Sequence, residues 1–259
     1  LLTGSTLVST LVLGILTAIR GKLPSLLRFN RKDLVFSALM GLLNPVSYYL
    51  ILFKAYRILP AQVAQPLNMI WPIVLVLLAI PVLGQRISWL SLGAMLLSFS
   101  GVVLVSLMGG TVSLDPQNRL GIVLALSTSV IWALYFLYNT RDKKDPLTRL
   151  FLNFCCASLY LLLASLFINE PFPASMEAWF AALYVGVFEM GLTFVLWLTA
   201  IRLAPSSDRI SNLVYMAPFL NLLFASQVLG EDIYLTTVFG IILLVAGIVI
   251  QNLSAKHAK

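Results

Sequence analysis

Apolar side chains fill long, nearly continuous runs along this chain, and polar side chains gather between the runs. A helix that crosses a bilayer needs about 20 consecutive, mainly apolar residues. Nine runs approach or reach this length, at 2–19, 34–53, 61–83, 89–108, 120–139, 150–168, 179–200, 210–229 and 233–253. The alternating pattern of transmembrane barrel strands is absent from the sequence. The pattern therefore predicts an all-α polytopic membrane protein with nine spans.

The composition excludes several classes of protein. Of the 259 residues, 60% are apolar and only 10% are charged. A soluble domain carries about 25% charged residues. This chain has too little polar surface to cover a globule in water, which excludes a soluble enzyme, a nucleic-acid-binding domain and a disordered chain. No link between the runs is long enough to form a second, soluble domain.

Basic residues alternate between the two sides that these spans define. Fourteen of the 17 Lys and Arg residues fall on one side, and only Lys54, Arg57 and Arg119 fall on the other. Loops rich in Lys and Arg are cytoplasmic. We therefore expect the first residue outside, the C-terminus in the cytoplasm, and the loop near Pro171 outside, in a cell inner (plasma) membrane.

The second half of the chain resembles the first. Pro72 and Pro218 lie 146 residues apart, as do Gly84 and Gly230, and Gly101 and Gly247. Gly41 and Gly186 lie 145 residues apart. The charge pattern gives the matched spans opposite directions, so the sequence predicts two inverted repeats, the architecture of many secondary transporters. We expect a first repeat of four helices over residues 1–110 and a second of five over 119–259.

Each copy has a Pro in its second-last helix, then Leu-Gly-Glu or a variant, and then a last helix that contains Gly. This arrangement resembles the drug/metabolite transporter superfamily, EamA type. Pro218 with Leu-Gly-Glu at 229–231 matches fully, Gln85 departs from the pattern in the first copy, and Trp-Ala-Leu-Tyr at 132–135 also fits. The resemblance implies a ten-helix exporter of amino acids or other small metabolites that works by alternating access. The first helix of the family has no counterpart in this sequence, and the stretch 68–72 most resembles the aromatic-amino-acid exporter branch.

Glu189 is the acid that lies well inside an apolar run, and its repeat partner is Asn44. Ionisable side chains at membrane depth are costly and mark substrate or proton pathways. We therefore predict that Glu189 binds a proton or a substrate amine; a neutral, hydrogen-bonded structural acid is the alternative.

Polar and aromatic side chains recur at helical spacing on four repeat-matched helices. Such stripes face the bundle or a watery pore. They either line one central cavity or join neighbouring helices by hydrogen bonds. With two residues from run 120–139, the predicted substrate-binding set is Asn44, Tyr48, Gln65, Asn68, Trp71, Trp132, Tyr135, Glu189, Thr193, Trp197, Asn212 and Tyr215.

The matched prolines Pro72 and Pro218 are candidate hinges for gating, because proline frees a backbone carbonyl and bends a helix. No phosphate-binding Gly loop is encoded, and no His or Cys cluster has metal-ligand spacing. We expect no cofactor, no metal, no catalytic residue and no enzymatic activity.

The sequence thus predicts a secondary transporter of small metabolites, most simply an exporter of amino acids or related compounds. A nucleotide-sugar-type exchanger and a non-transporting membrane protein such as a lipid scramblase are the alternatives. The expected partners are a small-molecule substrate and the lipid bilayer, with no nucleic acid. Monomer and homodimer both fit.

Overall fold

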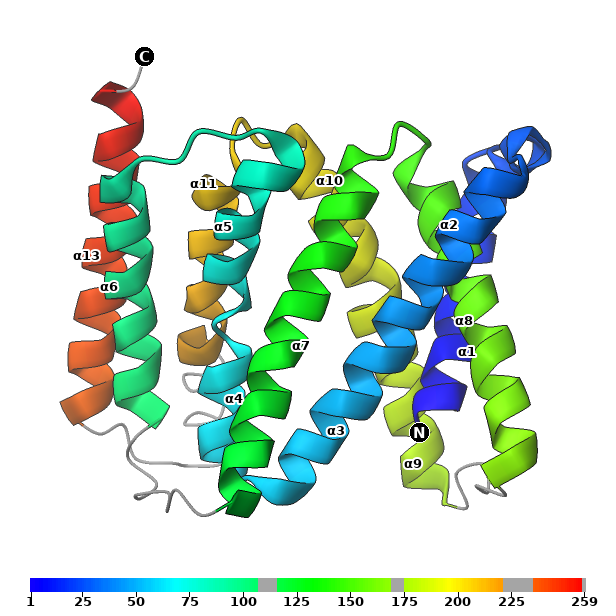
Figure 1. The fold of residues 1–259 in the computed structure, drawn as a ribbon, viewed down its shortest axis with the longest axis horizontal. Coiled ribbons are helices and arrows are strands. Elements are labelled where there is room, and N and C mark those ends of the chain that lie inside the picture. The colour runs from blue at the N-terminus through cyan, green and yellow to red at the C-terminus, as the bar shows by residue number, and fades with distance from the viewer. Residues whose placement is uncertain (107–115, 169–174, 221–234, 258–259) are drawn as a thin grey trace. The chain divides into compact units, whose positions relative to one another are not determined.

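The computed structural model describes residues 1–106, 116–168, 175–220 and 235–257, and this part of the chain contains helices and no strand (Figure 1). The first half holds α1 (Leu2–Ile19), η1 (Leu23–Arg28), α2 (Arg31–Gly41), η2 (Leu42–Ser47), α3 (Tyr48–Ile58), α4 (Ala61–Asn68), α5 (Trp71–Leu83) and α6 (Trp89–Ser106). The second half holds α7 (Pro116–Arg141), α8 (Pro146–Ile168), α9 (Met176–Tyr184), η4 (Val185–Thr193), α10 (Phe194–Leu203), α11 (Ser207–Ser211), η5 (Asn212–Tyr215) and α13 (Leu235–His257).

Six helical segments of the described chain are long and apolar enough to cross a membrane: Leu2–Ile19, Arg31–Ile58, Val63–Leu83, Asn118–Arg141, Pro146–Phe167 and Met176–Leu203. Two shorter apolar helices, Trp89–Leu104 and Val238–Gln251, lie at the fourth and ninth predicted runs. The eighth run, 210–229, is helical as far as residue 220, and its remainder lies outside the described residues, as does the loop near Pro171.

Helix caps explain why two spans begin earlier than hydropathy indicates. Asn30 caps α2 by accepting a hydrogen bond from the Asp33 amide, while the Asp33 carboxylate accepts one from the Asn30 amide. This capping box satisfies two amides that a helix start leaves without partners. Ser175 caps α9 with its hydroxyl oxygen, which accepts a hydrogen bond from the Ala178 amide. The caps fix the helix starts in polar sequence, outside the apolar runs.

The chain folds into two compact units. Unit 1 comprises Leu1–Leu50 and Tyr138–Leu203, and unit 2 comprises Ile51–Leu137 and Ala204–Lys259. Each unit therefore combines a segment of the predicted first repeat with a segment of the predicted second repeat.

In unit 1, α1 packs against α8, α9 and η4, and α2 packs against α8. Gly41 allows α2 to approach closely, because a Cβ atom there would lie 2.4 Å from the Asn153 carbonyl oxygen of α8. Gly186 does the same on η4, where a Cβ atom would lie 2.6 Å from the Ser5 carbonyl oxygen of α1. Where α1 crosses α8, the hydroxyls of Thr10 and Ser158 form a 2.8 Å hydrogen bond.

In unit 2, α6 and α13 run side by side in opposite directions (Figure 1). A Cβ atom at Gly101 would lie 2.5 Å from the Gly240 carbonyl oxygen, and one at Gly247 would lie 2.5 Å from the Ala94 carbonyl oxygen. The two contacts are related by one shift of 146 residues, which maps Gly101 onto Gly247 and Ala94 onto Gly240.

The apolar core of unit 2 lies beside this helix pair. Its buried members come from α5, α6, η5, α13 and the helical residues 216–220: Ile73, Val76, Met95, Val102, Tyr215, Phe219 and Leu244.

A buried arginine organises one end of unit 1. The Arg149 side chain, at the start of α8, is 1% exposed and forms ion pairs with Asp33 of α2 and with Asp142. It also donates hydrogen bonds of 2.9 Å to the Ser37 hydroxyl and to the Asp33 carbonyl. Because a buried charge is stable only when it is paired and hydrogen-bonded, this network fixes α2 and residue 142 to the start of α8.

A second polar network closes one end of unit 2. The Asp208 side chain of α11 is buried and accepts hydrogen bonds from the Ser91 hydroxyl of α6 and the Gln251 amide of α13. Gln251 also donates to the Asp208 carbonyl oxygen, over 2.8 Å. Three helices are thus joined through one carboxylate.

Candidate substrate site

Glu189 lies on η4, a π-helix, and its side chain is exposed. The Tyr49 hydroxyl of α3 donates a 2.7 Å hydrogen bond to its Oε1 atom. Tyr48 is buried beside Tyr49, with the two rings edge to face at 4.9 Å between centroids. The acid that the sequence singles out is thus both accessible and oriented by a phenol. Such a carboxylate can accept a proton or bind a cationic amine.

Of the predicted pair, Glu189 lies in the π-helix η4, and Asn44 lies in η2, a π-helical segment in which two helices meet at a kink. π-helical segments are rare and frequently occur at functional sites. Asn44 has non-helical dihedrals (φ −148°, ψ 122°) and precedes Pro45, whose nitrogen has no hydrogen to donate. The Asn44 amide is buried, and no hydrogen bond joins it to another described residue. The backbone is therefore irregular at both positions that carry a polar side chain.

The π-helix η4 changes which residues lie on one face of this span. Glu189, Thr193 and Trp197 share a face if every turn is α-helical, but the turns of η4 are wider as far as Thr193. Thr193 is exposed and Trp197 is half-buried. Their common face stays a prediction.

A second set of predicted residues meets in unit 2, where the helix breaks between α4 and α5. The Asn68 side-chain amide donates a 3.0 Å hydrogen bond to the Thr128 hydroxyl of α7, and the Asn68 backbone carbonyl accepts one of 2.9 Å from the Ser129 hydroxyl. The rings of Trp71 and Trp132 lie 5.6 Å apart between centroids. The break thus brings an amide, two hydroxyls and two indoles together.

The other predicted residues of unit 2 lie in different surroundings. Gln65 is exposed, whereas Tyr135 is buried with its ring 5.1 Å from that of Phe136. Asn212 is buried, and its amide has no hydrogen bond to another described residue. Tyr215 lies in the apolar core, with its ring 5.7 Å from that of Phe99.

The candidate hinges occupy unequal positions. Pro72 lies in the first turn of α5, directly after the break, where a missing amide hydrogen removes no helical bond. Pro218 lies within the helical residues 216–220. Their gating role stays a prediction.

The structure divides the predicted site residues between the two units. Unit 1 holds Asn44, Tyr48, Glu189, Thr193 and Trp197, and unit 2 holds Gln65, Asn68, Trp71, Trp132, Tyr135, Asn212 and Tyr215. A cavity shared by the two sets stays a prediction.

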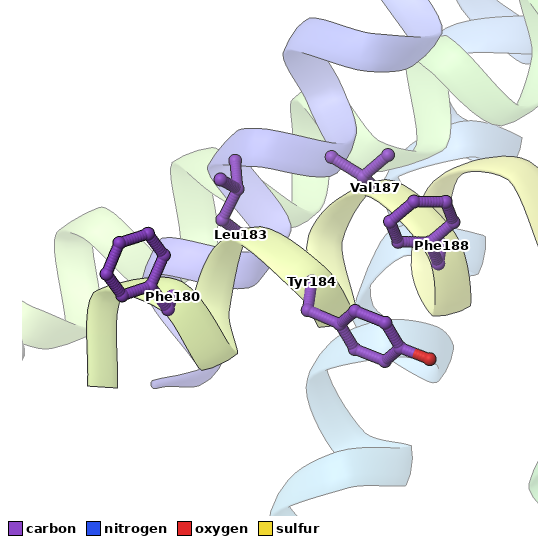
Figure 2. Close-up of a pocket in the computed structure, with 5 residues that line it drawn as sticks. All are labelled: Phe180, Leu183, Tyr184, Val187 and Phe188. Atoms are coloured by element: carbon purple, nitrogen blue, oxygen red, sulfur yellow. The ribbon is translucent and has the colours of Figure 1, made fainter. Parts of the chain in front are cut away.

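An apolar hollow lies on the surface of α9 and η4, lined by Phe180, Leu183, Tyr184, Val187 and Phe188 (Figure 2). None of the predicted site residues lines it. Its lining suits hydrocarbon chains better than a polar metabolite, because the Tyr184 hydroxyl is its only polar side-chain group.

Comparison with known families decides the identity of the chain. The model of the EamA-like transporter family matches residues 1–107 and 119–253. The chain belongs to the EamA-like transporter family. The family and the apolar helices together make it a multi-pass membrane protein, and they confirm the resemblance read from the repeat motifs.

Several EamA-like relatives have informative names. An uncharacterized transporter of Bacillus subtilis (strain 168), YvbV, is 28% identical over 197 residues, which is 69% of this chain and 62% of the relative. The aromatic amino acid exporter YddG of Ancylobacter novellus is 27% identical over 153 residues, or 58% and 53% of the two chains. A probable terminal-alkyne amino-acid exporter of Streptantibioticus cattleyicolor is 25% identical over 234 residues, or 87% and 75%.

Two further facts bear on these matches. The chain spans between about half and two thirds of the length of the first two relatives, YvbV and YddG. A crystal structure matches the fold with a TM-score of 0.81 and 22% identity, over 97% of this chain and 88% of the other. That likeness establishes the fold alone.

Proposed function

We propose that this EamA-like protein is a secondary transporter that exports amino acids or related small metabolites by alternating access. The hydrogen-bonded, accessible carboxylate of Glu189 on a π-helix is the observation that carries the proposal. The names of two relatives, one an aromatic amino acid exporter and one a probable terminal-alkyne amino-acid exporter, support the substrate class.

The proposed architecture is nine spans in two inverted repeats. The antiparallel pair α6 and α13 supports it, because Gly101 and Gly247 make equivalent contacts with the opposite helix after one shift of 146 residues. The pair Gly41 and Gly186 adds to this support, since each packs on the helix that matches the other's partner, α8 and α1. Inverted repeats supply the two alternative states that alternating access requires.

In this proposal the substrate binds at polar residues of the predicted set. Glu189, Tyr48 and Asn44 of unit 1 offer a carboxylate, a phenol and an amide, and Asn68, Trp71 and Trp132 of unit 2 offer an amide and two indoles. This chemistry fits a ligand with an ammonium group and an apolar or aromatic side chain. The protein lies in the inner membrane with its C-terminus in the cytoplasm, as the distribution of basic residues indicates.

Glu189 also serves as the proton-coupling group in this scheme. A proton and a substrate amine compete for one carboxylate, so protonation on one side of the membrane favours substrate release there. The Tyr49 hydroxyl, which donates to Oε1, holds the acceptor in place.

The test is counterflow in proteoliposomes with amino acids, nucleosides and nucleotide sugars, measured across a range of pH. We expect exchange of an amino acid, and we expect Glu189→Gln to keep exchange while removing the pH dependence of net transport. Tyr49→Phe should lower the rate about tenfold, since a hydrogen bond to a charged group contributes about 1.5–3 kcal/mol. Glu177→Gln, an exposed acid at the start of α9, is the matched control.

Each alternative function has its own outcome in the same vesicles. Exchange restricted to nucleotide sugars would favour the exchanger, and lipid translocation without solute exchange would favour the scramblase. An unchanged pH profile in Glu189→Gln would show that Glu189 has a structural role and does not couple transport to protons.

A further inference from the structure

The connection between α1 and α2 carries apolar side chains on its surface. Leu27 of η1 is 90% exposed, Ile19 at the end of α1 is 75% exposed, and Leu23 is 44% exposed. Three neighbouring aliphatic side chains in water would be unfavourable, because burial of apolar surface is the main favourable term in folding. They are suited to the boundary between acyl chains and headgroups, where a short amphipathic helix inserts its apolar side.

The same connection carries cations that pair with none of the described acids. Arg20, Arg28, Arg31 and Lys32 are exposed, and in the described part of the chain none of them forms an ion pair.

The acids of this end of unit 1 are already occupied. Asp145 pairs with Lys22, Asp142 pairs with Arg149, and Asp33 pairs with Arg149 and Lys144. A local excess of positive charge therefore remains beside the exposed leucines.

Helix stability does not account for the position of two of these cations. Arg31 and Lys32 occupy the first turn of α2, where the helix dipole presents its positive end. Cations there are unfavourable for the helix, and the capping box of Asn30 and Asp33 forms without them. Their placement fits a cytoplasmic loop rich in basic residues, and it leaves both cations available to an anionic group outside the protein.

Contacts with the segment before α8 hold η1 and its flanking residues in place. Phe29, directly after η1, lies under the Arg149 guanidinium at 4.7 Å and the Lys144 ammonium at 5.0 Å. Lys144 donates a 3.3 Å hydrogen bond to the Arg28 carbonyl, and Lys22 pairs with Asp145. Both ends of η1 are thus fixed to the segment that leads into α8, at the top of unit 1 in Figure 1 (blue, between α1 and α2).

We propose that η1 and the first turn of α2 form a binding surface for the headgroups of anionic phospholipids. The cations Arg20, Arg28, Arg31 and Lys32 contact the phosphates, and Leu23 and Leu27 enter the layer just below them. Clusters of four to eight basic residues next to a transmembrane helix bind anionic lipid in this way. The proposal concerns the lipid alone and is independent of which solute the protein transports.

The experiment uses the full chain in nanodiscs of phosphatidylcholine mixed with phosphatidylglycerol, and native mass spectrometry counts the lipids that stay bound. Wild type should retain phosphatidylglycerol in preference to phosphatidylcholine. Arg28→Gln/Arg31→Gln/Lys32→Gln should weaken this preference strongly, by about fivefold for each residue neutralised. The matched control is Lys54→Gln/Arg57→Gln, which removes exposed cations that also form no ion pair in the described chain.

Two further measurements separate lipid binding from unfolding and from charge alone. The triple variant should unfold at the wild-type temperature in phosphatidylcholine, and only wild type should gain stability when phosphatidylglycerol is added. Leu27→Ser keeps every charge and should still lower retention, because the apolar anchor is lost. Equal retention of both lipids by wild type, or unchanged preference in the triple variant, would overturn the proposal. If the triple variant does not fold, Lys32→Gln alone, at an exposed position, provides the same comparison.

Discussion

At the scale of single residues, Arg149 shows how a charge is accommodated next to a membrane span. Its guanidinium bonds two carboxylates, a hydroxyl and a carbonyl, and its Cζ atom lies over the rings of Phe29 and Phe36, 4.7 and 4.9 Å from their centroids. Arginine suits this position because its planar fork forms several directed hydrogen bonds and also stacks on rings.

We expect Arg149→Ala to lower the free energy of unfolding by about 3–5 kcal/mol, because it leaves the Asp142 carboxylate without its ion-pair partner and leaves Asp33 with Lys144 alone. Titration of mixed micelles with denaturing detergent measures this. The control is Arg141→Ala, an exposed arginine without an ion pair in the described chain, which should change stability by no more than about 1 kcal/mol. Equal effects of the two variants would show that the network contributes no stability.

Asp145 gives unit 1 a defined response to acid. Burial alone would raise the pKa of Asp145, but the Lys22 ammonium and the amides of Thr148 and Leu147 outweigh it and hold the pKa below its ordinary value of 3.8. The folded protein therefore binds this proton less readily than the unfolded chain. The contribution of Asp145 is complete above pH 3.8 and is lost as the pH falls through the lowered pKa.

Thermal unfolding in detergent across this range should show a smaller acid-induced loss of stability in Asp145→Asn than in wild type. Lys22→Gln should also flatten the curve, since it removes a main cause of the lowered pKa. A curve for Asp145→Asn that coincides with wild type would contradict the assignment.

The sequence alone points to Glu189 and Asn44, but it does not distinguish Arg149 and Asp208 from other charged residues. Glu189 interrupts an apolar run, so a one-dimensional pattern reveals it. Arg149 and Asp208 lie at helix ends, where charges are common. Their importance comes largely from partners on other helices, such as Ser37 and Gln251, which lie 112 and 43 residues away in the chain. Only the packed structure shows which charges at helix ends are buried.

At the scale of helices, close packing on glycine holds α6 against α13. We expect Gly101→Ala to destabilise unit 2 by about 1–3 kcal/mol, the usual effect of overpacking, because its Cβ atom would lie 2.5 Å from the Gly240 carbonyl oxygen. Gly93→Ala is the control on the same helix: nothing lies within 4 Å of its Cβ position, so it should be neutral or stabilising.

The inverted-repeat proposal adds a requirement, namely that Gly247→Ala behaves like Gly101→Ala. Detergent-induced unfolding compares the three variants directly. If Gly93→Ala and Gly101→Ala had the same effect, the close contact would have no energetic role.

Hydropathy located most of the helices and failed at their irregularities. The runs at 34–53 and 179–200 correspond to single apolar segments, yet each contains a π-helix, and the run at 61–83 breaks between Asn68 and Trp71. A hydropathy profile reports how apolar each position is, whereas a π-turn or a break depends on which backbone groups are hydrogen-bonded. Pro45 and Pro66 predict that these helices are irregular, but they do not predict whether the irregularity is a π-helix or a break.

At the scale of the whole molecule, the distribution of basic residues predicts the orientation in the membrane. In a background with Cys155→Ala and Cys156→Ala, a thiol reagent that does not cross membranes should label Arg57→Cys from outside the cell and leave Arg28→Cys and Lys143→Cys unlabelled. All three positions are exposed in the structure, so accessibility depends on the side of the membrane. Labelling of Arg28→Cys but not of Arg57→Cys would reverse the orientation.

The division into two interleaved units has a consequence for biosynthesis. Unit 1 joins residues 1–50 to residues 138–203, so α1 and α2 leave the ribosome long before α8 exists. During that interval Asp33 lacks its Arg149 partner, and the backbone at Gly41 is not yet covered by α8. The early helices therefore depend on lipid or on a membrane chaperone until the later ones arrive. We therefore expect a product truncated after its first repeat to be degraded, because unit 1 lacks α8 and cannot pack.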